Sequence, residues 1–119
     1  MISQKPFLIR AIYEWCKENE FTPYMAVRVD HNTNVPMQYV QDGQIVLNVA
    51  QEATKNFFIS NSTVGFKATF HNVVYDIEIP IANILAIFAK ENGQGMSFNL
   101  ENPPPEVQSE IKSSLKLVK

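Results

Sequence analysis

Alternation of apolar and polar residues with a period of two limits the fold of this chain more than any other feature. It begins after Pro23 and returns repeatedly up to residue 79. Such alternation is typical of half-buried β-strands. We expect short strands over residues 25–30, 35–40, 44–50, 57–60, 64–70 and 73–79, with a last short strand over 96–98. Short strands joined by close turns predict a strongly bent sheet or a small barrel, which limits exposed sheet edges.

Two dipeptides mark tight turns between these strands. Asp42-Gly43 separates residues 35–40 from 44–50, and both residue types tolerate a positive φ, which predicts a hairpin. His71-Asn72 forms the short connection between residues 64–70 and 73–79. Both dipeptides therefore predict closely connected neighbouring strands.

A helical pattern precedes the strands, over residues 6–19. Pro6 is a favourable first helical residue. Two apolar stripes run along this segment: one is formed by Leu8, Ile12 and Trp15, and the other by Ile9, Tyr13 and Cys16. Either one stripe faces the core and the other a partner subunit, or both pack within the same domain. The pattern alone leaves both possibilities open.

Residues 80–90 carry a second helical pattern. Pro80 opens the segment, and its apolar residues follow the spacing i, i+3, i+4, i+7, namely Ile81, Ile84, Leu85 and Phe88. Asn92-Gly93 supplies the expected end. The predicted fold is therefore mostly β with α, with one helix at the N-terminus and a second after the last long strand.

The composition changes after residue 98. Residues 99–114 contain three consecutive prolines and few apolar residues, which is typical of a flexible linker. Residues 115–119 are again apolar and basic, whereas ordinary tails are polar throughout. We therefore expect a folded domain over residues 1–98, a linker over 99–114 and an interaction motif over 115–119.

Composition and charge exclude several classes of protein. Hydrophobic residues make up 45% of the 119 residues and charged residues 18%, as in a globular domain. The net charge of −2 disfavours nucleic acid, although a small barrel with one local basic patch keeps RNA binding as an alternative. The single cysteine excludes an intrachain disulfide. With no apolar run of about 18 residues and no signal peptide pattern, the sequence predicts a cytoplasmic protein without a membrane span.

The residue types that carry catalysis are not arranged for it. His31 and His71 both fall in expected turns, and Cys16 lies on the apolar side of the first helix. The sequence holds no cysteine and histidine cluster with metal-ligand spacing and no glycine-rich phosphate loop. We therefore expect neither an enzyme nor a bound metal or cofactor.

One expected strand, residues 44–50, has a face suited to a peptide. Ile45, Leu47 and Val49 form its apolar face. The opposite face, with Val46, Asn48 and Ala50, is mixed instead of charged, so the amide could bond a main chain while its neighbours accept side chains. Coverage by another part of the same domain is an equally good interpretation.

Several segments, in the same order along the chain, resemble the stringent starvation protein B (SspB) family. The resemblance covers nearly all of residues 6–98 and is carried by Phe7 to Trp15, Thr22-Pro23-Tyr24, Val35 to Tyr39, Asp42 to Ala50, Ile79 to Ala82 and Leu85 to Gly93. At the C-terminus, Leu115-Lys116-Leu117-Val118-Lys119 is similar to the family's terminal motif, with a lysine in place of arginine and a leucine in place of valine.

The resemblance implies an adaptor in proteolysis with a partly open, Sm-like barrel. Its groove would hold the ssrA degradation tag, its terminal motif at residues 115–119 would bind the N-terminal zinc domain of the ClpX unfoldase, and its first helix would form a homodimer. From the strand face and the family pattern we expect the tag-binding residues Met37, Tyr39, Val46, Asn48, Ala50, Phe70 and His71. At the dimer interface we expect Leu8, Ile9, Ile12, Tyr13 and Cys16.

A linker of this length sets the reach of the expected tether. Residues 99–114 would span about 50 Å when fully extended and about 22 Å as a random coil. Tethering would make the engagement of the tag by ClpX effectively intramolecular.

Overall fold

The computed structural model describes residues 2–98, which form one helix, three short 3-10 helices and seven strands. The bounds of these elements, in chain order, are α1 Lys5–Glu18, β1 Pro23–Arg28, η1 Met37–Tyr39, β2 Gln44–Asn48, η2 Gln51–Ala53, β3 Lys55–Ile59, β4 Thr63–Phe70, β5 Val73–Pro80, η3 Ile81–Asn83, β6 Ile84–Ala89 and β7 Gly95–Ser97. The linker and terminal motif expected at 99–119 lie outside the described residues.

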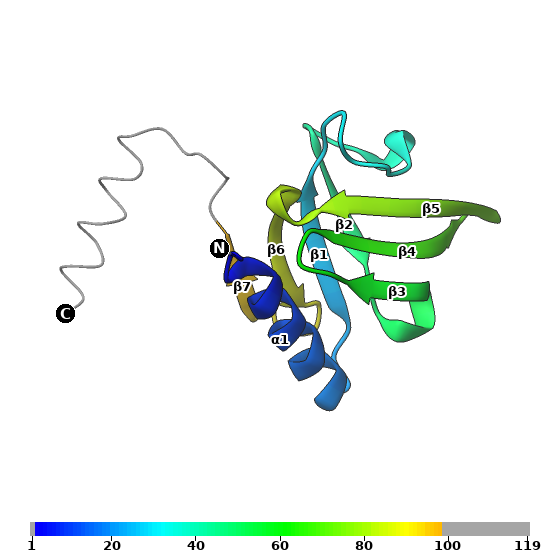
Figure 1. Cartoon of the computed structure of the whole chain (residues 1–119). Helices are drawn as coiled ribbons and strands as arrows, with labels where there is room; N and C mark the ends of the chain where they lie inside the picture. The colour runs from blue at the N-terminus through cyan, green and yellow to red at the C-terminus, as the bar shows by residue number, and fades with distance from the viewer. Residues whose placement is uncertain (1, 99–119) are drawn as a thin grey trace.

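The strands form two antiparallel sheets (Figure 1). One has four strands in the order β2-β1-β6-β7, and the other has three in the order β3-β4-β5. A register shift between Ala26 and Val27 interrupts the pairing of β1 with β6, and such irregularities bend a sheet. The expectation of a β-rich domain with an N-terminal helix is confirmed. The strand pairing gives two separate sheets within residues 2–98, so it does not confirm a Sm-like barrel.

The two sheets enclose one apolar core. Most of its buried side chains come from the strands, and the largest fully buried ones include Ile9 of α1 together with Met25, Leu47, Ile79, Ile84 and Ile87. The apolar faces predicted for residues 44–50, 64–70 and 73–79 supply Ile45, Leu47, Val64, Phe66, Ile77 and Ile79 to this core. Alternation with a period of two therefore identified the correct buried face in these three strands.

Helix α1 closes one side of the core, beside β6 and β7 in Figure 1. Pro6 lies in its first turn, as expected. Ile9, Tyr13 and Cys16 are buried in the domain's own core, whereas Leu8 and Ile12 are only partly buried. Ile9, Tyr13 and Cys16, three of the residues predicted for the dimer interface, therefore pack within the domain, and the interface itself stays a prediction.

The predicted second helix is wrong. Residues 81–83 form the single 3-10 turn η3, and Ile84–Ala89 form β6, which pairs with β1 on one side and β7 on the other. An apolar run such as ILAIFA fits one face of a helix and also fits a central strand, so periodicity cannot separate the two. The neighbours β1 and β7 decide for the strand because they satisfy its main-chain hydrogen bonds.

The strand predicted over residues 35–40 is also wrong. This segment contains the 3-10 helix η1, and the only strand-like pairings next to it are two isolated bridges that flank it, Asn34 with Glu78 and Gln41 with Gln44. Pro36 precedes η1 and has no N–H to donate to a ladder. The two predicted turns are confirmed, since Asp42, Gly43, His71 and Asn72 all have positive φ. The last predicted strand is confirmed as β7.

Candidate functional site

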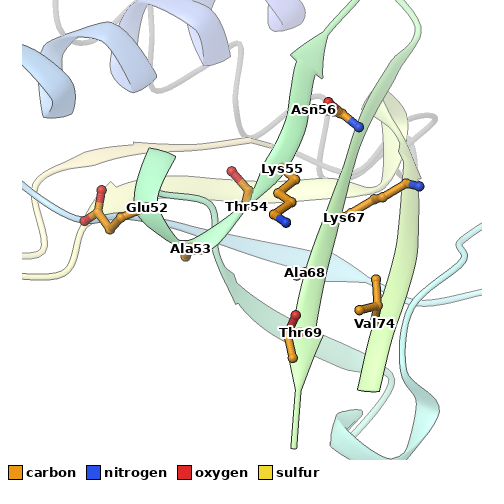
Figure 2. A pocket seen from close by; sticks show the side chains of 9 residues that line it. All are labelled: Glu52, Ala53, Thr54, Lys55, Asn56, Lys67, Ala68, Thr69 and Val74. Atoms are coloured by element: carbon orange, nitrogen blue, oxygen red, sulfur yellow. The ribbon is translucent and has the colours of Figure 1, made fainter. Parts of the chain in front are cut away.

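The candidate site is a pocket of about 650 Å³ beside the three-stranded sheet (Figure 2). Its walls come from η2, the start of β3, the end of β4 and one residue of β5. The lining residues are Glu52, Ala53, Thr54, Lys55, Asn56, Lys67, Ala68, Thr69 and Val74. A volume of this size lies within the range of pockets that hold small ligands or several residues of a peptide.

The pocket forms where β3 separates from β4. The register of the β3–β4 pair shifts between Lys55 and Phe58, and Asn56 has a φ of 55° inside this irregularity. Asparagine tolerates such a φ better than most residues. Beyond Lys55 the chain turns away into η2, while β4 continues to Phe70. The separation leaves the end of β4 without β3 as a neighbour.

Local hydrogen bonds fix the side of the pocket formed by η2. The Asn48 side-chain oxygen accepts from the Ala50 N–H at 3.0 Å, and the Ala50 carbonyl accepts from the Thr54 hydroxyl at 3.1 Å. The Ala53 N–H also donates to the Ala50 carbonyl at 3.0 Å. Ala50 is almost fully buried, so these bonds anchor η2 to the core at the end of β2.

The charges of the pocket are mainly positive. Lys55 and Lys67 lie directly opposite each other in the β3–β4 ladder, and Figure 2 shows both side chains at the pocket. Like charges placed opposite each other on neighbouring strands are destabilising. An anionic or carbonyl-rich ligand between them would relieve this repulsion. The remaining lining combines hydroxyl groups (Thr54, Thr69) with small apolar groups (Ala53, Ala68, Val74) and one carboxylate, Glu52.

An aromatic cluster holds η1 against the turn between β4 and β5. The Tyr39 ring stacks on Phe70 and on His71, with centroids 5.2 and 5.7 Å apart, and Phe70 meets Tyr75 edge to face. The Gln38 amide also donates to the Tyr75 hydroxyl at 2.7 Å. These contacts connect the segment after β1 to the second sheet.

The residues predicted to bind a peptide lie in two groups, and none of them lines the pocket in Figure 2. Tyr39, Phe70 and His71 belong to the aromatic cluster, with Met37 beside them on η1 and 64% exposed. The second group follows β2, where Val46 is 55% exposed and Asn48 is exposed. Ala50 is buried, but it anchors η2 and so adjoins the pocket.

Three residues that line the pocket, Lys55, Lys67 and Thr69, were not among the site residues predicted from the sequence. The available signal was that one face of residues 64–70 carries Lys67 and Thr69 while the preceding strand begins with Lys55. The amino-acid sequence around Asn56 gave no clear indication of the register shift beside the pocket.

Two potentially reactive side chains of α1 are buried. Burial raises the pKa of the Tyr13 hydroxyl and of the Cys16 thiol, so both groups are held neutral. In the part of the chain that the structure covers, no three histidine, cysteine, aspartate or glutamate side chains gather as they would around a metal ion. No helix among residues 2–98 is both long and apolar enough to cross a bilayer.

The fold and the pocket define a small two-sheet domain whose open surface suits binding. Comparison with known proteins gives its family. The family model of SspB, stringent starvation protein B, matches residues 3–117. A protein of Haemophilus influenzae described as a stringent starvation protein B homolog is 42% identical over 109 residues, which cover 91% of this chain and 70% of that protein. The chain belongs to the stringent starvation protein B family, as the sequence motifs predicted.

Proposed function

We propose that this protein is an adaptor that binds ssrA-tagged polypeptides and delivers them to the ClpX unfoldase for degradation by ClpXP in the cytoplasm. The observation that carries the proposal is the family match over residues 3–117, because it includes both the folded domain and the start of the apolar, basic terminus. The adaptor itself supplies no catalytic step. Unfolding and proteolysis belong to its partners.

The pocket beside β4 supports the binding half of this proposal. It is open, and it places two ammonium groups next to hydroxyls and small apolar side chains. A peptide has a carbonyl at every residue and side chains of alternating direction, so it can use both kinds of contact at once. The peptide occupies this pocket and extends toward the exposed residues Val46 and Asn48 or toward the cluster around Tyr39.

The delivery half of the proposal depends on the terminal motif. Leu115, Leu117 and Val118 supply apolar contact with the N-terminal domain of ClpX, and Lys116 and Lys119 set its orientation. A tether of the length of residues 99–114 raises the local concentration of the bound tag near ClpX to about the millimolar range. Two weak contacts then act together.

A homodimer would present two such tails. The outward stripe of α1 supports this part of the proposal, since Leu8 and Ile12 are only partly buried. Ile12 also lines a shallow pocket of about 440 Å³ together with Ala11, Trp15, Gln94 and Gly95. Leu8 and Ile12 are the two partly buried members of the five residues predicted for the interface.

The binding half is tested by titrating a fluorescent ssrA-tag peptide. Exchanging both lysines of the pocket, Lys55→Glu with Lys67→Glu, removes its positive donors and should weaken peptide binding about tenfold or more. The matched control is Lys17→Glu with Lys90→Glu, an equal charge change at two exposed residues away from the pocket, which should bind as the unchanged protein does. Equal loss in both proteins would show that general charge, and not the pocket, governs binding.

The delivery half is tested by deleting residues 115–119. Degradation of a tagged protein by ClpXP at low adaptor concentration should fall to the rate without adaptor, while peptide affinity is retained. Persistent delivery by the shortened chain would overturn the tethering proposal. Steeply salt-dependent binding of a fluorescent RNA, without any peptide binding, would instead favour an RNA-binding module.

A further inference from the structure

The C-terminal end of α1 forms a second pocket together with the segment that follows β2. Its volume is about 230 Å³, and its lining residues are Tyr13, Lys17, Glu20, Phe21, Pro23, Ala50, Gln51 and Glu52. We call it the acidic pocket, because it contains two carboxylates and one ammonium group. Only Glu52 also lines the pocket in Figure 2, so the two pockets adjoin but are separate.

Glu20 occupies a backbone position that glycine usually holds. The Glu20 N–H donates to the Lys17 carbonyl at 3.2 Å, and the Phe21 N–H donates to the Cys16 carbonyl at 2.8 Å. These two bonds define a Schellman motif, in which Glu20 has the left-handed φ of 57°. Such a φ is unfavourable for a residue with a Cβ, and the partial negative charge of a helix C-terminus also disfavours a carboxylate. Unfavourable residues of this kind concentrate at binding sites.

The two carboxylates of the acidic pocket are not neutralised by the described residues. The Lys17 ammonium forms an ion pair with Glu14, one turn earlier on α1, at 3.6 Å. Within residues 2–98, the side chains of Glu20 and Glu52 have neither an ion-pair partner nor a hydrogen bond. The pocket therefore holds two unpaired negative charges beside a cation that already has a partner.

Tyr13 adds a buried polar group to the acidic pocket. Its side chain is only 9% exposed, and its ring stacks on Phe57 with centroids 4.6 Å apart. Within residues 2–98, the Tyr13 hydroxyl has no hydrogen-bond partner, which is rare for a buried polar group. Burial raises the pKa of this hydroxyl, and the negative charges of Glu14 and Glu52 raise it further. The hydroxyl is therefore available to a ligand and lies in a negative potential.

We propose that the acidic pocket binds a primary ammonium group carried on a short aliphatic stem. An ammonium group has three N–H donors, which match the two carboxylates and the phenol oxygen. The stem packs against the apolar part of the lining, which is formed by Phe21, Pro23 and Ala50. An anion would be repelled by the two carboxylates, and an uncharged ligand would leave them unpaired.

Two sources can supply this ammonium group. One is a free alkylamine in solution, and the other is a lysine of the terminal motif, either Lys116 or Lys119. In the second case the terminal motif would have to leave the domain before it could bind a partner. The chemistry at the acidic pocket is the same in both cases, so one probe tests both.

Butylamine, which reproduces the side chain of lysine, is the probe, and NMR of the full chain with labelled tyrosine rings is the measurement. The Tyr13 signals, identified with Tyr13→Phe, should shift as butylamine is added at neutral pH, with a Kd of about 1 to 20 mM. Butanol has a similar stem without the charge and should bind about tenfold more weakly. Equal binding of butanol would overturn the proposal, as would Tyr13 signals that stay unchanged up to about 100 mM butylamine.

Removing single charges from the protein locates the site. Glu20→Gln and Glu52→Gln should each weaken butylamine binding about threefold, because each removes a carboxylate and keeps the shape of the side chain. The matched control is Glu18→Gln, the same change at an exposed residue of α1 outside the pocket, which should bind as the unchanged protein does. An equal loss in all three variants would overturn the proposal, because butylamine would then respond only to the net charge.

Deletion of residues 115–119 separates the two sources of the ammonium group. If the shortened chain binds butylamine about threefold or more tightly than the full chain, Lys116 or Lys119 competes for the pocket and is its ligand. Equal binding by the two chains supports the site and assigns it to an amine from outside the chain. None of these measurements uses a tagged peptide or ClpX, so a failure of this site would leave the proposed adaptor function intact.

Discussion

The two sheets of this domain differ in how much of their surface they keep from water. In the four-stranded sheet, β1 and β6 each have a strand on both sides, and β6 buries Ile84, Ile87 and Ala89 completely. In the three-stranded sheet only β4 has two neighbours, and one face exposes Phe58, Lys67, Thr69 and Val74. The first sheet is therefore the more deeply buried of the two, while the second leaves more side chains exposed on its outer face.

This difference explains where the pocket lies. A central strand cannot offer an edge, because neighbours on both sides satisfy its main chain. The three-stranded sheet offers one at the end of β4, where the pairing with β3 stops at Lys55. Rigid support beside an incomplete edge is the arrangement that a peptide-binding surface needs.

The largest expected effect compares one substitution in the two sheets. Val27→Ala in β1 should lower the free energy of unfolding by about 2 to 3 kcal/mol, because Val27 is fully buried and the change leaves a cavity. Val74→Ala in β5 should lower it by less than about 1 kcal/mol, because Val74 is mostly exposed. Urea denaturation of both variants measures the difference. Equal losses would show that the three-stranded sheet is as closely packed as the other.

An intermediate effect is expected at two glycines that approach a neighbour closely. A Cβ on Gly95 would meet the main chain of Ile87 and Phe88, which cannot move without disturbing the β6–β7 pair. A Cβ on Gly65 would meet only the ring of Phe58, which is half exposed and can swing aside. Gly95→Ala should therefore cost about 1 to 3 kcal/mol of stability, and Gly65→Ala clearly less.

Thermal unfolding of the two glycine variants gives the order of these effects. A double variant that adds Phe58→Ala to Gly65→Ala should remove most of the remaining loss, since the ring is the sole close neighbour. The reverse order, with Gly65→Ala the more harmful, would contradict the idea that the exposed sheet is the more adaptable one.

The smallest effect is a pH dependence located in the four-stranded sheet. Thr22 donates its N–H and its hydroxyl to the Glu91 carboxylate at 2.8 and 2.7 Å, which ties the β6–β7 connection to the start of β1. The Thr22 N–H, followed by the hydroxyl, holds the pKa of Glu91 below its usual value of 4.5. Because the folded-state pKa is the lower one, this contribution is present above pH 4.5 and is lost as the pH falls through the folded-state pKa.

Glu91→Gln isolates that contribution. The stability difference between the unchanged protein and Glu91→Gln should be constant near neutral pH and should shrink below about pH 4.5. Denaturation curves recorded at several pH values measure it. A difference that stays constant down to pH 2 would mean that the Thr22 contact does not depend on the carboxylate charge.

Much of the fold was predictable from local patterns. Pro6 and the apolar spacing after it predicted α1, and Asp42-Gly43 and His71-Asn72 predicted the turns found there. The burial of Ile45, Leu47, Ile77 and Ile79 followed from alternation alone. The adaptor interpretation came from family motifs, and the comparisons confirm the family.

The errors concern segments whose structure depends on distant partners. Residues 84–89 form a strand because β1 and β7 lie on either side, and the segment after Pro36 forms η1 because the Phe70 ring and the Tyr75 hydroxyl hold it. The pocket also depends on residues that are distant in sequence, since Lys55 and Lys67 come together only through the pairing of β3 with β4.

The sequence by itself determined the periodicity of each segment, the positions of the tight turns and the family. Those properties arise from residues within a few positions of one another. Only the tertiary structure decided that β6 is a strand, that Ile9, Tyr13 and Cys16 belong to the core, and that β4 keeps a free edge at Thr69. The physical reason is that main-chain hydrogen bonds in a sheet join residues far apart in the chain, so a free edge is defined by the strands around it and not by its own residues.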